Sequence, residues 1–213
     1  MKRKVPRFQL LTNCCIPYTD LIHKVELAIK SGVDCIQYRC RPGRECYTEA
    51  KTLAELCKQA KIRFVINDHV HMAYHLNQEG LQAGVWLGKQ DMAIPVARSI
   101  LGPETFIGLS VNAISELHRA NHLPVDAVAA NGVFACTSNP HAQVMGLAGL
   151  QEMVAFSEHP ILAIGGITPS NVRDVFETDV DGIALSGAIL RANDIENITK
   201  CLLELCNQYI DYP

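Results

Sequence analysis

Two carboxylates, Asp68 and Asp91, are the residues of this sequence best suited to hold a metal ion. Each follows a short apolar run typical of a buried strand, and the two runs are consecutive along the chain. Mg²⁺ takes oxygen ligands, commonly one or two carboxylates together with phosphate oxygens of a substrate. A single carboxylate after a strand, however, is more often a helix cap or an ion-pair partner. Two interpretations therefore stay open, a Mg²⁺ site and an ordinary structural role.

Two arginines lie close to these carboxylates in the predicted order of elements. Arg39 and Arg41 are two residues apart, so an extended segment places both side chains on the same face. Guanidinium groups bind phosphate oxygens through paired hydrogen bonds. If the chain turns between the two arginines, only one faces the site and the other is solvated.

Glycine-containing turns follow the last two apolar runs and are candidates for binding a phosphate. Glycine allows the backbone to approach an anion closely, and free N–H groups at the start of a helix favour negative charge. A lone glycine pair more often makes only a tight turn. The second turn, directly after the next run, favours a phosphate site, and the four residues concerned are Gly165, Gly166, Ser186 and Gly187.

Other chemistry is less well supported. His71 and His75 have the spacing that can present two metal ligands on one helix face, but the sequence lacks the glutamate of the HExxH pattern. The sequence also lacks the GxSxG nucleophile elbow, the Walker loop GxxxxGK[ST] and the dinucleotide-binding GxGxxG pattern. These absences count against zinc proteases, serine hydrolases and nucleotide-binding folds.

Eight short apolar runs must position the candidate residues. Most are continuously hydrophobic, which is typical of parallel strands covered on both faces. Amphipathic helical patterns lie between them, with Thr19, Thr48 and Ser170 expected as N-caps and a closing helix expected over residues 195–210. The predicted strands are residues 7–12, 35–38, 63–66, 84–87, 106–109, 127–130, 161–164 and 182–185.

This alternation predicts an α/β fold, a (β/α)8 TIM barrel that forms a single domain over residues 1–213. A doubly wound open sheet uses similar units and is the alternative. In a barrel, functional residues lie at the carboxyl ends of the strands. The candidate residues named above all follow predicted strands.

Composition limits the partners of the chain. With 48% hydrophobic and 19% charged residues, the chain can bury a core and is not a disordered protein. A net charge of −3 gives no footprint for nucleic acid or an anionic membrane, so we expect small-molecule substrates. Nine scattered cysteines without a CxxC pair indicate a reducing compartment. Without a signal peptide or a membrane-length apolar run, a cytoplasmic location is expected, and a homo-oligomer stays open.

Six blocks of the sequence, in order and at barrel spacing, resemble the thiamine phosphate synthase and TenI family. The resemblance extends from LLTN near the start to the last predicted strand. It implies a (β/α)8 barrel, in agreement with the pattern of strands and helices. The blocks are CIQYRCR, FVINDHVHMA, GVWLGKQDM, IGLSV, AIGGITPSNV and VDGIALSGAI.

The resemblance implies a transferase that couples two thiamine precursors. An aminopyrimidine diphosphate loses pyrophosphate, and the nitrogen of a thiazole phosphate takes its place to give thiamine phosphate. The family step is dissociative, through a carbocation that the pyrimidine stabilises. Such an enzyme has to orient its two substrates and neutralise the departing diphosphate.

The resemblance also implies roles for single residues. Gln37 would hold the pyrimidine edge, Asn67 would contact the pyrimidine or the diphosphate, and Ser110 would lie near the reacting pyrimidine. Arg39 and Arg41 would bind the diphosphate, with Arg41 standing where the family usually has lysine. Mg²⁺ would be held by Asp68 and Asp91, and the thiazole phosphate by backbone N–H groups of Gly165, Gly166, Ser186 and Gly187.

The sequence departs from the family after the sixth predicted strand. The synthase pattern GPxFxTxTK is replaced by NGVFACTSN over residues 131–139. Cys136 and Ser138 stand for the two threonines and Asn139 for the lysine, with Ser138 and Asn139 still implied as substrate-binding residues. Lys89 and His141 are candidate substitutes for the missing charge. The residues implied in catalysis are Arg39, Arg41, Ser110 and Ser138.

Two alternatives remain at this point. A TenI-like thiazole tautomerase needs no metal, but those relatives carry a histidine after the sixth strand, where this sequence has Asn131-Gly132. A non-catalytic barrel that binds a phosphate ligand for regulation would explain the lost lysine. Trp86, which stands where the family usually has histidine, is expected to line the pocket or to pack in the core.

Overall fold

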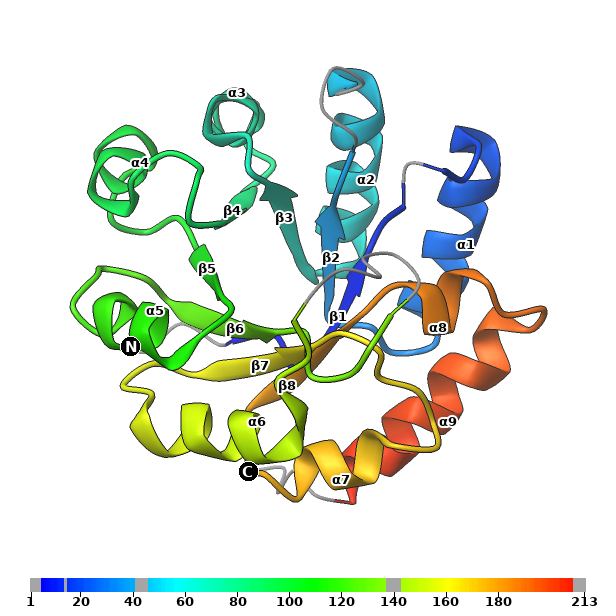
Figure 1. Cartoon of the computed structure of the whole chain (residues 1–213). Coiled ribbons are helices and arrows are strands. Elements are labelled where there is room, and N and C mark those ends of the chain that lie inside the picture. The colour runs from blue at the N-terminus through cyan, green and yellow to red at the C-terminus, as the bar shows by residue number, and fades with distance from the viewer. Residues whose placement is uncertain (1–4, 14, 41–45, 137–142, 209–213) are drawn as a thin grey trace.

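Eight parallel strands close into a barrel surrounded by helices (Figure 1). The computed structural model describes residues 5–13, 15–40, 46–136 and 143–208. Each strand pairs with its neighbours in the sequence, and β1 pairs with β8 to close the ring. The strands are β1 (Phe8–Leu11), β2 (Cys35–Tyr38), β3 (Arg63–Asn67), β4 (Gly84–Leu87), β5 (Ile107–Val111), β6 (Ala127–Asn131), β7 (Ile161–Ile164) and β8 (Gly182–Leu185).

The closed ring confirms the predicted (β/α)8 barrel and excludes the open sheet. All eight predicted strands are present, and three of them end one or two residues later than expected, at Asn67, Val111 and Asn131. The strand hydrogen bonds therefore hold Asn67, Ser110 and Asn131 at the mouth of the barrel. The assignment of residues 1–213 to one domain stays a prediction, because both ends of the chain lie outside the described residues.

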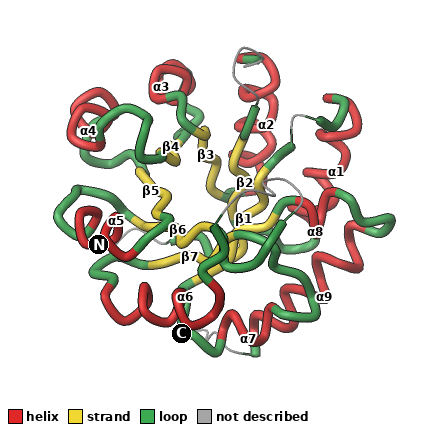
Figure 2. The backbone as a smooth tube through the Cα atoms, viewed as in Figure 1, coloured by secondary structure: helices red, strands yellow, loops and turns green. Residues whose placement is uncertain are grey.

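Helices form the outer layer, as Figure 2 shows in red around the yellow strands. Apolar residues on the inner face of each helix, such as Leu21, Val25 and Ala28, are buried against the barrel. The helices are α1 (Tyr18–Lys30), α2 (Tyr47–Ala60), α3 (Val70–Gln78), α4 (Ile94–Leu101), α5 (Ile114–Ala120), α6 (Gly146–Phe156), α7 (Val172–Phe176), α8 (Gly187–Leu190) and α9 (Ile195–Asn207).

The predicted N-caps were wrong. Thr19 and Thr48 lie inside the first turns of α1 and α2, which begin after Pro17 and Cys46 without a side-chain cap. Ser170 is displaced by Asn171, whose amide joins the β7–α7 turn: Oδ1 accepts from Thr168 N–H at 2.8 Å and Nδ2 donates to Gly166 O at 3.0 Å. The Asn171 side chain thus forms its hydrogen bonds within the β7–α7 turn and does not cap α7.

The closing helix begins as predicted at Ile195 and is described to Asn207, with residues 209–213 outside the described part. It has the cap that sequence reasoning missed, because the Asp194 side chain accepts from Asn197 N–H at 2.9 Å.

The inside of the barrel is filled by side chains from five strands and by Phe106, which directly precedes β5. Trp86 and Phe106 pack there with the side chains of smaller apolar residues, namely Cys35, Val65, Ala127, Ala129 and Leu162. Gly108 makes room for the indole, because a Cβ at that position would lie 2.5 Å from a Trp86 ring carbon. The interior is therefore a packed core below the mouth, as expected of this fold.

Three aspartates join neighbouring strands at the opposite, amino-terminal end of the barrel. Asp34, Asp126 and Asp181 each follow a valine and directly precede β2, β6 and β8. Each carboxylate accepts a backbone N–H at the start of the preceding strand, from Phe8 at 3.0 Å, Ile107 at 2.8 Å and Ile161 at 2.8 Å, respectively. This repeated arrangement holds the strand ends farthest from the candidate site.

Within the part of the chain that the structure describes, no helix has the length and apolar character needed to cross a membrane.

We expect Asp126→Ala to lower the free energy of unfolding by about 2 kcal/mol, because charged hydrogen bonds contribute about 1.5–3 kcal/mol each. The variant loses the bond from Ile107 N–H and the 2.9 Å ion pair with Arg98. Urea unfolding measures the change, with exposed Glu204→Ala expected within about 0.5 kcal/mol of the parent as control. Equal stability of the two variants would contradict the role of Asp126.

Candidate active site

Polar side chains gather at the carboxyl ends of β2, β3, β4 and β5. Gln37 and Asn67 come from the strands themselves, whereas Arg39, Asp68 and Asp91 come from the loops that follow. Hydrogen bonds or electrostatic interactions connect these five residues into one cluster. The structure therefore brings these five predicted residues together, and their functional roles stay a prediction.

Asp68 and Asp91 lie close enough for their carboxyl groups to interact. Asp68 has a left-handed backbone, with φ of 66°, and its N–H donates to Trp86 O at 2.9 Å. Asp91 is held by Gly88, whose N–H donates to Oδ2 at 2.6 Å. Left-handed backbone is uncommon outside glycine and is tolerated best by Asn and Asp. The fold thus turns the two carboxylates toward each other.

The crowding of the two carboxylates changes the ionisation of Asp68. Withdrawal from solvent, the hydrogen bond to Asp91 and the like charge of Asp91 together raise the pKa of Asp68 to about 7. The nearby Arg39 guanidinium and the Asn67 side chain, which donates to Asp68, oppose this rise in pKa. Two neighbouring carboxylates favour a bound cation or a proton shared between them.

Arg39 is positioned by Thr12, the residue after β1. The Thr12 hydroxyl accepts from Arg39 N–H at 2.8 Å and donates to Arg39 O at 3.2 Å. Thr12 is 2% exposed, so its hydroxyl lies in a dry environment. The two bonds hold the backbone of an arginine whose side chain is exposed at the mouth.

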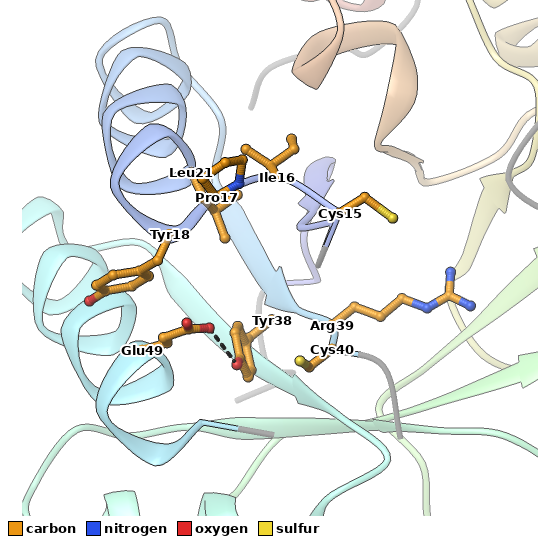
Figure 3. Close-up of a pocket in the computed structure, with 9 residues that line it drawn as sticks. All are labelled: Cys15, Ile16, Pro17, Tyr18, Leu21, Tyr38, Arg39, Cys40 and Glu49. Atoms are coloured by element: carbon orange, nitrogen blue, oxygen red, sulfur yellow. Dashed lines mark hydrogen bonds between the residues drawn. The ribbon is translucent and has the colours of Figure 1, made fainter. Parts of the chain in front are cut away.

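A cavity of about 450 Å³ lies beside Arg39, between α1 and α2 (Figure 3). Tyr38 and Glu49 are joined across it by a 3.1 Å hydrogen bond. The Arg39 side chain extends away from Tyr18 and Glu49, as the close-up shows. The guanidinium is thus free to face the acidic pair, with which it interacts electrostatically.

Ser110 is connected to the interior of the barrel through Trp86. The indole Nε1–H donates to Ser110 Oγ at 3.2 Å. Ser110 and Asp91 also line a second cavity of about 300 Å³ between α4 and α5. Ser110 therefore stands between the packed core and the carboxylate pair.

The two glycine turns lie at the ends of β7 and β8, as predicted. For Gly165 and Gly166, backbone conformation and packing already explain why the residue is glycine. Both have positive φ, 113° and 64°. A Cβ on Gly165 would lie 3.0 Å from the Gly132 backbone, and one on Gly166 would lie 2.6 Å from Ala135 O. Close packing against the segment after β6 thus accounts for this pair, while Ser186 and Gly187 begin α8.

Several predicted residues cannot be placed. Arg41, Ser138, Asn139 and His141 lie outside the described residues. Lys89, the other candidate substitute for the missing lysine, forms an ion pair with Glu116 at 3.1 Å. Its charge is therefore already matched by Glu116 in the first turn of α5.

The two histidines with metal-ligand spacing belong to one helix. His71 and His75 lie exposed on α3 in the outer layer. Among the residues described, no three His, Cys, Asp or Glu side chains come together as a metal site. The candidate metal site thus consists of the two carboxylates alone.

Sequence reasoning missed Thr12 and Gln9, and it left the role of Trp86 open. Thr12 is signalled only by a threonine at the end of an apolar run, in LLTN. Gln9 is a single polar residue within that run, and its side chain donates to Gln37. Such isolated polar residues in a buried strand are the available sequence signal, because burial requires them to find hydrogen-bond partners.

Comparisons with known proteins agree on one family. Residues 9–189 match the family model described as thiamine monophosphate synthase. A thiamine-phosphate synthase of Persephonella marina is 33% identical over 192 residues, covering 89% of this chain and 90% of the relative. One from Synechococcus sp. is 34% identical and covers 90% of this chain, which spans 54% of that longer relative.

A solved structure supports the same relationship. The thiamine phosphate pyrophosphorylase from Pyrococcus furiosus superposes with a TM-score of 0.83 at 32% identity. The match covers 96% of this chain and 97% of that one.

We expect Thr12→Val to lower the free energy of unfolding by about 1–3 kcal/mol, because it leaves the Arg39 N–H without its acceptor. Thr12→Ser keeps the hydroxyl and loses one methyl group, for an expected cost of about 0.8 kcal/mol. Urea unfolding compares the two variants. A serine variant that is no more stable than the valine variant would contradict this role of the hydroxyl.

The raised pKa of Asp68 predicts a pH dependence of stability. The unfolded carboxyl loses its proton near pH 4, whereas the folded one keeps it to about 7. Between these values the folded state binds more protons, so the free energy of unfolding of the metal-free protein falls as pH rises from about 4 to about 7. Asp68→Asn, which tolerates the same backbone, should flatten this fall.

Denaturant unfolding across this pH range, with exposed Asp174→Asn as control, measures the difference. A parent and an Asp68→Asn variant with the same slope would show that Asp68 does not titrate in this way.

Proposed function

The chain belongs to the thiamine monophosphate synthase family, and from this membership we propose the reaction that it catalyses. It joins 4-amino-2-methyl-5-hydroxymethylpyrimidine diphosphate to 4-methyl-5-hydroxyethylthiazole phosphate and gives thiamine phosphate and pyrophosphate. The observation that carries the proposal is the contact between Asp68 and Asp91 beside Arg39. An acidic pair next to a cation is the arrangement that a diphosphate with a divalent ion requires.

The reaction needs positioning and charge stabilisation from the chain. The bond from the pyrimidine methylene to the diphosphate oxygen breaks, the oxygen keeps the electron pair, and the thiazole nitrogen then bonds to the methylene carbon. Arg39 would stabilise the charge that grows on the departing diphosphate. Gln37, Asn67 and Ser110 would orient the pyrimidine so that its methylene faces the thiazole.

The donor set at the mouth fits Mg²⁺. Asp68 and Asp91 offer hard oxygen ligands, and their contact leaves a concentration of negative charge that a divalent ion relieves. Mg²⁺ usually keeps water and substrate oxygens as its other ligands, so two carboxylates suffice. When bound there, it would neutralise diphosphate oxygens and so improve the leaving group.

The thiazole phosphate is proposed to lie at the ends of β7 and β8. An anion bound by backbone N–H groups requires the backbone to approach it closely. The proposed donors are the backbone N–H groups of Gly165, Gly166, Ser186 and Gly187. The adjacency of the two strand ends supports this placement. It also puts the phosphate on the side of the mouth opposite the acidic pair.

The tautomerase alternative is less well supported than the synthase. A tautomerase needs no metal, yet the chain brings two carboxylates into contact at a cost in electrostatic free energy. A cytoplasmic location and a homo-oligomeric state stay part of the proposal, and the scattered cysteines support the former.

The direct test is turnover by the purified full chain. With both precursors and Mg²⁺, we expect pyrophosphate and thiamine phosphate in equal amounts, and with chelator we expect neither. The double variant Asp68→Asn with Asp91→Asn should lose more than about 100-fold in rate, because metal stabilisation of a developing charge amounts to several kcal/mol.

The matched control is Asp174→Asn with Glu204→Gln, which makes the same change in net charge at exposed positions. Full activity of the Asp68 and Asp91 double variant would contradict the metal assignment. Folded parent protein that forms no product with Mg²⁺ would contradict the synthase itself.

A further inference from the structure

Gln9 is a buried amide that the proposed reaction does not use. It lies in β1, is 1% exposed, and its Oε1 has no hydrogen-bond partner among the described residues. Its Nε2 donates to Gln37, which shares one face of β2 with Cys35 of the interior cluster. Gln9 therefore lies inside the barrel, beneath the candidate active site.

Three amides form a chain that rises from Gln9 to the acidic pair. Gln9 Nε2 donates to Gln37 Oε1, and Gln37 Nε2 donates to Asn67 Oδ1 at 2.6 Å. The Asn67 side chain interacts in turn with Asp68, whose pKa it lowers, so its amide N–H end faces the carboxylate. In the strand register Gln9 is level with Cys35, and Gln37 with Val65, so each step climbs two residues to the next strand.

The chain of amides has a direction, and its upper end determines that direction. Each carboxamide has one donor end and one acceptor end, so turning one amide turns its neighbours. In the reverse direction Asn67 would present its oxygen to the Asp68 carboxylate, which is unfavourable. Both directions leave one polar group unpaired at Gln9, and in the observed direction this group is Oε1.

The unpaired oxygen argues against a purely structural role for Gln9. A buried acceptor without a partner destabilises the fold, and an apolar side chain of the same shape would avoid that penalty. The amide group does, however, hold the Gln37 oxygen in place. The Gln9 side chain therefore serves to order Gln37 and Asn67.

We propose that Gln9 is a positioning residue that holds the Gln37 carboxamide, and through it the Asn67 carboxamide, in the place where the two amides meet the pyrimidine diphosphate. This inference rests on the proposed function, because it assigns the substrate on which the two amides act. Gln9 itself touches neither substrate.

Gln9→Met keeps the length of the side chain and removes both the donor and the unpaired oxygen. We expect KM for the pyrimidine diphosphate to rise about five- to tenfold, the effect of one lost hydrogen bond, with kcat within about twofold. KM for the thiazole phosphate should stay unchanged. The melting temperature should change little, because the variant removes the unpaired Gln9 oxygen but leaves the buried Gln37 oxygen without its donor.

Thr199→Val is the matched control, because Thr199 is the other residue with a buried, unpartnered polar atom among those described and lies on α9 in the outer layer. It should leave both KM values unchanged. A Gln9→Met variant with the parent KM for the pyrimidine diphosphate would overturn the inference, as would an equal rise in both KM values. Gln9→Leu provides a second variant if the methionine variant fails to fold.

A measurement without ligand separates this inference from the proposed function. In ¹⁵N-labelled protein, the Gln37 side-chain amide should give two sharp signals that exchange slowly with water, and in Gln9→Met they should shift and exchange faster. Unchanged signals would overturn the role of Gln9 whatever the reaction is. Lack of turnover by the parent protein, with these signals changed, would overturn the proposed reaction alone.

Discussion

Hydrogen bonds between β1 and β8 close the sheet, and the arrangement of the site depends on this closure. A closed parallel ring sends the carboxyl ends of all eight strands to one rim. It also forces alternate side chains of each strand into a narrow interior, which the Trp86 ring fills only because Gly108 has no side chain. The polar residues that end the strands therefore lie above a dry, packed core. In such surroundings hydrogen bonds hold side chains in fixed orientations.

Aspartate residues have different roles at the two ends of the barrel. At the amino-terminal end Asp34, Asp126 and Asp181 each accept a strand N–H, so their negative charge is matched and stabilises the fold. At the mouth Asp68 and Asp91 face each other, and their repulsion opposes folding. The same side chain thus supports stability at one end and binding at the other. The two roles differ because the carboxylates at the amino-terminal end accept backbone N–H groups, whereas Asp68 and Asp91 face each other.

Most of the fold could be predicted from the sequence because buried parallel strands are continuous apolar runs, and the barrel repeats this pattern eight times. The polar residues after the strands, such as Arg39 and Asp68, could be assigned to one rim for the same reason. Helix caps could not, since Thr19 and Thr48 compete with neighbouring residues that the tertiary contacts select. Nor could the partners of Gln9 and Thr12 be predicted, because they depend on the diagonal register between strands, which single-strand patterns do not contain.

The acidic pair and the amide chain form one electrostatic unit, and this explains how the site can be ready for a charged substrate before it binds. Asp68 takes a left-handed backbone, its N–H donates to Trp86 O, and its carboxyl group interacts with Asn67 and Asp91. The cost is an unpaired oxygen at Gln9 and two crowded carboxylates, both of which lower the stability of the free protein. The cation proposed for this pair would remove the second cost but not the first. Binding free energy could then be directed to the proposed diphosphate substrate, because the chain has already ordered the groups that would meet it.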